Sequence, residues 1–166
     1  MKLINFQDTT MRDGEQTPSI AYSYKDKKKL TEMLLKLSVD SIELGFPAAS
    51  KEECEIISKL ANYYSKANTK FVVFSRAIKE DIDEAYKSLK YAKSKRLQIV
   101  IPASDLHIRY SVSDDKNTIL KNVKSVVQYA KTKFNDIQFT AQDAPRANLD
   151  FLKKLIDIAV YNGIKI

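Results

Sequence analysis

The sequence predicts an α/β protein in which parallel strands are joined by helices, and three observations support this fold class. Short apolar or β-branched runs alternate along the chain with helical patterns. The 166 residues contain no Pro/Gly/Ser-rich linker and no low-complexity tract, so one domain is expected. Only three glycines occur, and none forms the Gly-x-Gly-x-x-Gly turn of a dinucleotide-binding sheet.

Five strands are expected, and a sixth starts near residue 164. Each expected strand is a short run of apolar and β-branched residues. The five runs are residues 3–6, 41–44, 70–74, 97–101 and 136–140. An eight-stranded barrel needs about 250 residues. This chain of 166 residues holds five βα units and the start of a sixth strand.

Helical periodicity is found between the expected strands. Apolar residues at helix spacing predict helices around 30–37, 56–64, 82–89, 119–130 and 152–159. Ser50 and Glu53 have the spacing of a capping box, and Gly163 is placed to end the last helix. The first of these helices is predicted from the helix spacing of Leu30, Met33, Leu34 and Leu37.

Composition disfavours several classes of function. Lys and Arg exceed Asp and Glu by 28 to 21, but most of the excess is lysine between residues 86 and 133 on polar helix faces. A solvated surface is therefore expected, with an anion-attracting face as the alternative, and no nucleic-acid partner. No apolar run approaches the ~18 residues of a membrane span, and no signal-peptide core precedes Asp8. The single Cys54 cannot form an internal disulfide. We expect a cytoplasmic protein without a membrane partner.

The densest polar cluster, residues 8–16 (Asp-Thr-Thr-Met-Arg-Asp-Gly-Glu-Gln), follows the first expected strand. In parallel α/β proteins, sites lie at the C-terminal ends of strands. A carboxylate such as Asp13 can hold a hard cation, and a guanidinium such as Arg12 can neutralise charge that develops on a carbonyl oxygen. The alternative interpretation is a polar loop with a structural Arg–Asp pair.

These nine residues closely resemble the signature of the acyl-CoA aldol and Claisen family that includes 2-isopropylmalate synthase, homocitrate synthase, citramalate synthase and HMG-CoA lyase. The family usually has leucine where this chain has Met11. The resemblance implies a TIM (β/α)8 barrel, a divalent metal (Mg, Mn or Zn) and an acyl-CoA substrate. Residues 1–166 would then be the N-terminal part of a pyruvate carboxyltransferase-type catalytic barrel domain, which is an incomplete barrel.

Later segments narrow the resemblance to the 2-isopropylmalate synthases. They follow the second to fifth expected strands and comprise residues 43–50, 75–77 with 81–85, 104–107 with Tyr110, and 139–144 with Arg146 and 150–152. The implied reaction condenses acetyl-CoA with 2-oxoisovalerate in leucine biosynthesis. Two alternatives stay open: a homocitrate or citramalate synthase-like enzyme, and a non-catalytic remnant or assembly partner.

The resemblance also implies roles for residues near the first two strands. Asp13 would be the carboxylate ligand of the metal, and Arg12 would stabilise the enolate or alkoxide oxygen. Gln16 would touch the 2-oxo acid or the thioester of acetyl-CoA. Glu43 would shape the 2-oxo-acid pocket, although it could instead simply pair with Arg12.

Three further residues are expected to bind substrate. Arg76 would lie at the mouth of the barrel, and the alternative is a structural ion pair. His107 would line the site above the fourth strand, although a lone histidine is usually structural. Gln142 stands where the family commonly has glutamate, and an amide cannot exchange protons near neutral pH as a carboxylate can.

The implied metal site is incomplete in this chain, because the family's other ligands are a His-x-His pair after the seventh strand. One carboxylate does not hold a divalent ion tightly. Open sheet edges would also leave Ile42, Val72, Ile99 and Phe139 without partners. We therefore expect little turnover by the chain alone, and either a homo-oligomer or association with the missing C-terminal part of the barrel.

Overall fold

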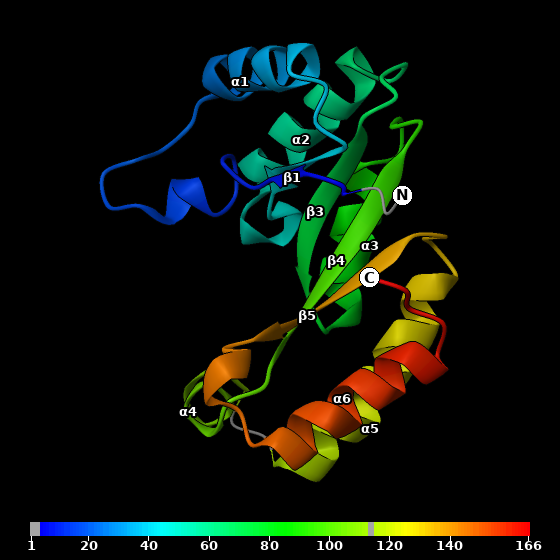
Figure 1. Cartoon of the computed structure of the whole chain (residues 1–166). Coiled ribbons are helices and arrows are strands. Elements are labelled where there is room, and N and C mark those ends of the chain that lie inside the picture. The colour runs from blue at the N-terminus through cyan, green and yellow to red at the C-terminus, as the bar shows by residue number, and fades with distance from the viewer. Residues whose placement is uncertain (1–3, 113–114) are drawn as a thin grey trace. The chain divides into compact units, whose positions relative to one another are not determined.

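The computed structural model describes residues 4–112 and 115–166, which form a five-stranded sheet in chain order (Figure 1). The pairs β1–β2, β2–β3 and β4–β5 are parallel. The strands are β1 (Gln7–Asp8), β2 (Ser41–Gly45), β3 (Lys70–Arg76), β4 (Lys95–Pro102) and β5 (Ile137–Gln142). This order confirms the expected succession of βα units.

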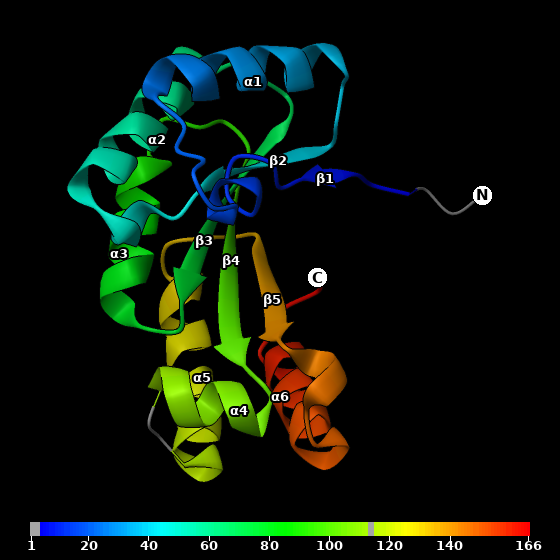
Figure 2. The same cartoon turned by 90° about the vertical axis from the view of Figure 1, so that its left-hand side faces the viewer.

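Helices alternate with these strands, and short helical turns follow several strand ends directly (Figure 2). The α-helices are α1 (Tyr24–Lys36), α2 (Lys51–Tyr63), α3 (Lys79–Ser88), α4 (Asp105–His107), α5 (Lys116–Lys131) and α6 (Leu149–Tyr161). The 3₁₀ turns are η1 (Gly14–Gln16), η2 (Pro47–Ala49) and η4 (Ala144–Arg146), and the π-helical segment η3 spans Ile108–Val112.

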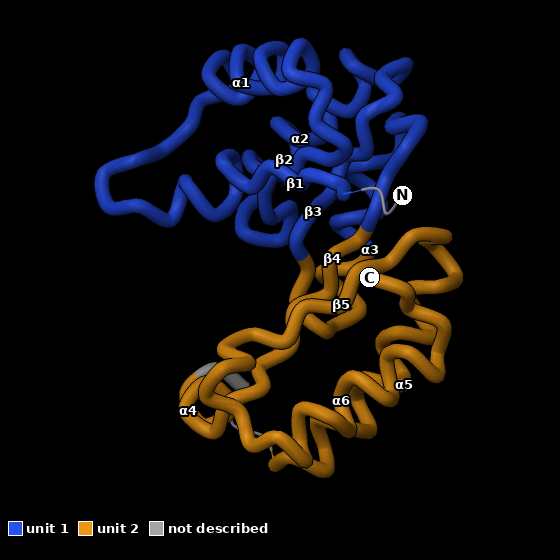
Figure 3. Tube along the Cα trace, in the orientation of Figure 1, with its two compact units in different colours: residues 1–74, 83–96 blue, residues 75–82, 97–166 orange. Residues whose placement is uncertain are grey.

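The chain divides into two compact units (Figure 3). Unit 1 comprises Met1–Phe74 and Asp83–Arg96, and unit 2 comprises Ser75–Ile82 and Leu97–Ile166. In unit 1, β2 packs against both α1 and α2. In unit 2, α5 packs against α6 through buried apolar residues such as Val127 and Leu155.

The first strand begins later in the chain than predicted. β1 begins at Gln7, where pairing with Ser41 of β2 starts, and residue 3 lies outside the described residues. Ile4 and Phe6 are apolar but 79% and 68% exposed, so their hydrophobicity did not indicate a buried strand. At the other end of the chain, residues 164–166 form no strand, although the backbone oxygen of Ile166 accepts a hydrogen bond from Phe139 N at 2.8 Å.

The apolar residues whose spacing predicted the first helix do not form the most buried face of α1. Lys27 and Thr31 are its fully buried residues, whereas Met33 and Leu37 are 52% and 72% exposed. The rotation of the helix follows the ion pairs of Lys27 rather than the apolar stripe, as described below. A capping box that the periodicity did not reveal, formed by Ser23 and Asp26, begins this helix.

Two other local predictions were tested at helix ends. The hydroxyl of Ser50 accepts a hydrogen bond from Glu53 N and caps α2. The Glu53 carboxylate binds Nζ of Lys27 at 2.6 Å, and the Ser50 half of the expected capping box is formed. Gly163, with φ +86°, follows the end of α6 as expected, because glycine adopts this conformation without strain.

The expectation that four core residues would lack partners was wrong for three of them. Ile42, Val72 and Ile99 are fully buried, and only Phe139 is half-buried. Ile42 is covered because side chains alternate along a strand, which places it opposite Glu43 on a strand that packs against α1 and α2. Within the described ranges, no helix has the length and apolar character to span a bilayer.

Candidate active site

The polar segment after β1 is folded into a tight turn by its own backbone. The carbonyl oxygen of Thr9 accepts hydrogen bonds from the backbone N–H groups of Arg12 (3.1 Å) and Asp13 (2.8 Å). Asp8 accepts two hydrogen bonds from Thr10, at its backbone N and its hydroxyl, both at 3.0 Å. Met11 is fully buried and anchors the turn, so its neighbours Arg12 and Asp13 are held at the end of β1.

Arg12 joins the ends of β1 and β2. Its Nε donates to Oε1 of Glu43 at 2.9 Å, and its Nη1 contacts Oδ1 of Asp13 at 2.9 Å. The guanidinium also lies over the ring of Phe74, 5.5 Å from the centroid. These two bonds leave further N–H donors on the guanidinium. Arg12 can therefore bind an anionic ligand while its position is fixed.

Glu43 is a buried carboxylate in the middle of β2. Its side chain is 0% exposed, and burial raises its pKa above the usual value although Arg12 acts in the opposite direction. Within the described part of the chain, Oε2 is buried without a hydrogen-bond partner. An unsatisfied buried oxygen is unfavourable, so this atom is suited to a ligand group or a proton that completes its hydrogen bonding.

The described residues do not make up a divalent-metal centre. Asp13 is 61% exposed, and one of its oxygens is engaged by Arg12. Among residues 4–112 and 115–166, no group of three His, Cys, Asp or Glu side chains could hold a metal ion. A hard cation takes six or more oxygen ligands or waters, so Asp13 offers a single carboxylate ligand and not a complete site.

Gln16 is the last residue of η1, one turn after Asp13. Its backbone N–H donates to the carbonyl oxygen of Asp13 at 3.1 Å, and its side chain is exposed. Of the predicted residues, Arg12 contacts both Asp13 and Glu43, and Gln16 lies in the same turn as Arg12 and Asp13.

A second polar cluster in unit 2 surrounds Asp143, which lies immediately after β5. Its carboxylate accepts a hydrogen bond from the Ser104 hydroxyl at 2.5 Å and pairs with Arg146 Nη2 at 2.6 Å. Nε2 of His107 lies 3.9 Å from Oδ2 of Asp143. The hydrogen bond from Ser104, followed by Arg146, lowers the pKa of Asp143. The cluster joins the segments after β4 and β5.

Asp143 itself adopts a left-handed backbone conformation, with φ +60° and ψ +34°. A non-glycine residue in this region is strained, and such residues are frequent at functional sites. The sequence interpretation assigned no role to Asp143. The available signal was its position directly after Gln142 in a segment that resembles the family.

Gln142 and Arg76 have different surroundings in unit 2. Gln142 ends β5 with an exposed side chain, and its carbonyl oxygen accepts a hydrogen bond from Ala103 N at 3.0 Å. Arg76 forms a two-point ion pair with the buried Asp81, at 2.8 and 2.9 Å, which raises the pKa of Arg76. This geometry fits the alternative interpretation of Arg76, in which the guanidinium forms a structural ion pair.

Parallel strands joined by helices, with polar residues after the strand ends, define an α/β protein, and comparison with known proteins identifies its family. Residues 3–166 match the HMGL-like family, and the chain belongs to it. The structure resembles the HMG-CoA lyase of Bacillus subtilis with a TM-score of 0.76 at 13% sequence identity, covering 97% of this chain and 55% of that one. The chain therefore has a TIM-barrel-like α/β fold that is incomplete, with five parallel strands.

Two relatives indicate a branch of this family. The chain is 41% identical over 159 residues to 2-isopropylmalate synthase 1 of Caldanaerobacter subterraneus subsp. tengcongensis, covering 96% of this chain and 40% of that protein. It is 37% identical over 163 residues to 2-isopropylmalate synthase of Streptococcus gallolyticus, covering 98% of this chain and 31% of that protein. The chain spans less than half the length of these relatives.

Proposed function

We propose that this chain forms the first part of the catalytic barrel of a 2-isopropylmalate synthase, which condenses acetyl-CoA with 2-oxoisovalerate in leucine biosynthesis. The observation that carries the proposal is the ion pair between Arg12, which belongs to the family signature in the turn after β1, and Glu43 of β2. The similarity to the two synthases supports the choice of this branch.

In this proposal Arg12 binds the 2-oxo acid and stabilises the negative charge that develops on its carbonyl oxygen during carbon–carbon bond formation. Its ion pair with Glu43 and its stacking on Phe74 keep the guanidinium in place before the substrate arrives. A preorganised cation stabilises a transition-state oxyanion more effectively than a mobile one. Glu43 shapes the pocket, and its unsatisfied Oε2 is available to a donor on the ligand.

Asp13 and Gln16 have supporting roles in the proposal. Asp13 contributes one carboxylate ligand to a divalent metal whose other ligands lie outside the described residues. Gln16 contacts the 2-oxo acid or the thioester of acetyl-CoA. In unit 2, His107 and Gln142 bind substrate, and Arg76 acts mainly through its pair with Asp81. The chain spans less than half the length of these relatives and offers a single carboxylate ligand for the metal, so the chain alone is expected to turn over little or not at all. Gln142 weakens the case for normal turnover further, because an amide cannot exchange a proton near neutral pH.

Binding of 2-oxoisovalerate to the purified chain tests the proposed site, with the backbone amide resonances of Thr9 and Asp13, which lie in the same turn, as the readout. Arg12→Lys is expected to weaken binding about tenfold or more, because a point charge replaces a bidentate donor. Arg109→Lys, at an exposed position of unit 2, is the matched control and should bind like the parent. Equal affinity in both variants would contradict the role of Arg12.

The acceptor and the turnover are tested separately. Binding of 2-oxoglutarate or pyruvate in preference to 2-oxoisovalerate would favour the homocitrate or citramalate synthase alternatives. CoA release from acetyl-CoA and 2-oxoisovalerate with Mg²⁺ or Mn²⁺ measures turnover, and robust release by the chain alone would contradict the expected inactivity. Restoration of turnover by a separately expressed C-terminal part of a relative would support the assignment.

Gln142 favours a second candidate, a non-catalytic assembly role, because it replaces a group that can carry a proton. In that case the chain forms a compact homo-oligomer and binds none of the three 2-oxo acids. Light scattering coupled to size-exclusion chromatography distinguishes this outcome from a monomer that captures a C-terminal part. For either function we propose a cytoplasmic location.

A further inference from the structure

The ammonium group of Lys27 is buried in unit 1, the unit that also contains Arg12 and Glu43. The Lys27 side chain is 0% exposed, although it lies in a helix whose neighbouring lysines face solvent. Burial of an unpaired ammonium is strongly unfavourable, so a fully buried lysine must have closely placed partners. Its partners therefore indicate why this position holds a cation.

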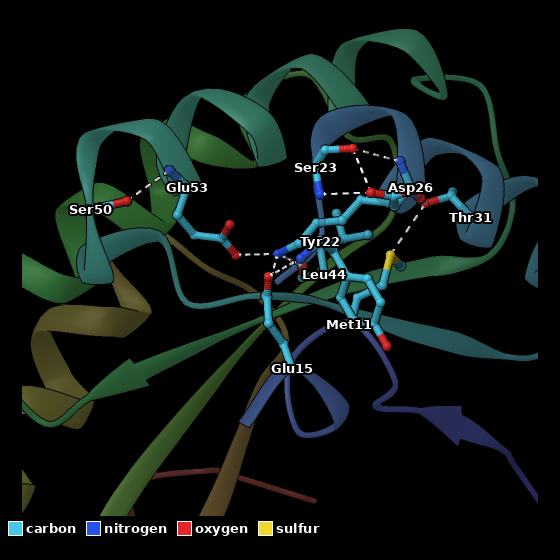
Figure 4. A network of polar contacts seen from close by, with 10 residues as sticks. Met11, Glu15, Tyr22, Ser23, Asp26, Thr31, Leu44, Ser50 and Glu53 are labelled. Atoms are coloured by element: carbon cyan, nitrogen blue, oxygen red, sulfur yellow. Dashed lines mark hydrogen bonds and ion pairs between the residues drawn. The ribbon is translucent and has the colours of Figure 1, made fainter. Parts of the chain in front are cut away.

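Lys27 has three oxygen partners, and each belongs to a different element. Its Nζ lies 2.6 Å from Glu53 Oε1 on α2 and 2.9 Å from Glu15 Oε2 on the turn η1. It also donates to the backbone oxygen of Leu44 in β2 at 3.4 Å. Figure 4 shows Glu15, Leu44 and Glu53 converging around one ammonium group. An ammonium has three N–H donors, so these partners can use all of them.

Two of the partners of Lys27, Glu15 and Leu44, are close in the sequence to Arg12 and Glu43. Glu15 follows Arg12 in the same turn, and its other oxygen accepts a hydrogen bond from Tyr22 N at 2.8 Å, which closes the loop. Leu44 follows Glu43, and the pairing of β2 with β3 shifts register between Glu43 and Gly45. Such irregularities redirect side chains near active sites. Lys27 thus contacts Leu44, which directly follows Glu43, and Glu15, which lies three residues after Arg12 in the same turn.

We propose that Lys27 is a positioning residue that sets the Arg12–Glu43 ion pair, by holding the turn of Arg12 through Glu15 and the irregular end of β2 through the carbonyl of Leu44. Lys27 contacts neither substrate nor Arg12 in this role. The inference rests on the proposed function only for its consequence, which is that the pair is preorganised for a 2-oxo acid. The contact with Glu53 neutralises charge and joins α2 to the same centre.

A compensated variant separates positioning from simple charge balance. Lys27→Met removes the cation but leaves Glu15 and Glu53 close together, which can prevent folding. Lys27→Met combined with Glu53→Gln removes one charge of each sign and is expected to keep the parent's urea midpoint. Lys29→Met, the same substitution at an exposed position of α1, is the matched control.

The readout is solvent exchange of the Arg12 Nε–H proton, assigned by its loss in Arg12→Lys. We expect exchange to accelerate about tenfold in the compensated variant, which corresponds to a pair weakened by about 1.4 kcal/mol. Glu15→Gln, at a partly exposed side chain, removes the charge of the turn alone and should accelerate exchange about threefold. Lys29→Met should leave the exchange rate at the parent value.

A compensated variant that folds and retains the parent exchange rate would overturn the proposal, because charge balance alone would then explain Lys27. If that variant does not fold, Glu15→Gln decides, and an unchanged exchange rate overturns the role of the turn contact. Addition of 2-oxoisovalerate distinguishes the two proposals. A parent chain that does not respond to this ligand contradicts the proposed function, while the exchange comparison still tests Lys27.

Discussion

Substitution of Gly45 by alanine tests how tightly the centre of unit 1 is packed. Gly45 ends β2 with φ +152°, a backbone conformation that side chains rarely adopt. A Cβ atom at this position would lie 1.9 Å from Oε1 of Glu53 and 3.2 Å from Cδ1 of Ile57. The clashing oxygen is the one that binds Nζ of Lys27 at 2.6 Å, so moving it to make room disturbs that ion pair.

The magnitude has two parts. A non-glycine residue in a strained backbone region is destabilised by about 1–3 kcal/mol. Loss of one partner from a buried ion pair destabilises by about 3–5 kcal/mol when the pair is broken completely. Lys27 retains Glu15 as a second partner, so the second part is reduced. We expect Gly45→Ala to lower the free energy of unfolding by about 4 kcal/mol.

A double-mutant cycle isolates the clash with the carboxylate. In a Glu53→Ala background the clash is absent, and Gly45→Ala should destabilise by only about 2 kcal/mol, which is the strain alone. Urea unfolding followed by circular dichroism measures all four free energies. Gly14→Ala is the control, because its Cβ would meet Thr10 no closer than 3.7 Å, and it should change stability by less than about 1 kcal/mol.

The explanation is refuted by either of two results. A change below about 1 kcal/mol for Gly45→Ala would show that the Glu53 carboxylate moves freely. Equal destabilisation in both backgrounds would show that the carboxylate is not the obstacle and that backbone strain accounts for the whole effect.

Three further predictions concern titratable groups. Burial raises the pKa of Cys54 to about 11, so its labelling by a thiol reagent at pH 8 should be at least about tenfold slower in the folded chain than in urea. Asp143→Asn should destabilise less than Asp143→Ala in urea unfolding, because asparagine tolerates positive φ. Burial raises the pKa of Glu43 in the folded chain. The stability that its protonated form contributes is therefore present below the unfolded-state pKa and lost as pH rises through the folded-state pKa. Glu43→Gln should gain stability relative to the parent between these two pKa values.

Each of these has a contradicting outcome. Equal labelling rates in the folded and unfolded chain would place Cys54 at the surface. Equal stability of the Asp143 variants would show that the backbone strain is unimportant. A Glu43→Gln variant whose stability follows the parent at every pH would mean that the buried carboxylate does not titrate differently in the two states.

The alternation of strands and helices could be predicted because it depends on local patterns. The apolar run of β3 and the helical spacing of Ile57 and Leu60 in α2 each fit one element, and burial in the structure agrees with them. The turn with Arg12 and Asp13 was also recognised, because its residues are adjacent in the sequence and its hydrogen bonds return to Thr9.

The predictions that failed depend on partners far away in the chain. The spacing of Leu30, Met33, Leu34 and Leu37 predicted a helix but not its buried face, because periodicity measures only hydrophobicity along one helix. Lys27 is fully buried through ion pairs with Glu15 and Glu53, which are 12 and 26 residues away in the chain. An ammonium that is matched by carboxylates can be buried, and no local pattern reports that match.

The amino-acid sequence by itself determined the succession of βα units, the family signature at residues 8–16 and the expectation that chemistry occurs where strands end. Only the tertiary structure decided that Glu43 is buried with Arg12, that Asp143 is strained beside Ser104, and that α1 turns Lys27 inward. The reason is physical. The strength of a charge interaction depends on distance and on exclusion of water, and the fold sets both by bringing separate segments of the chain together.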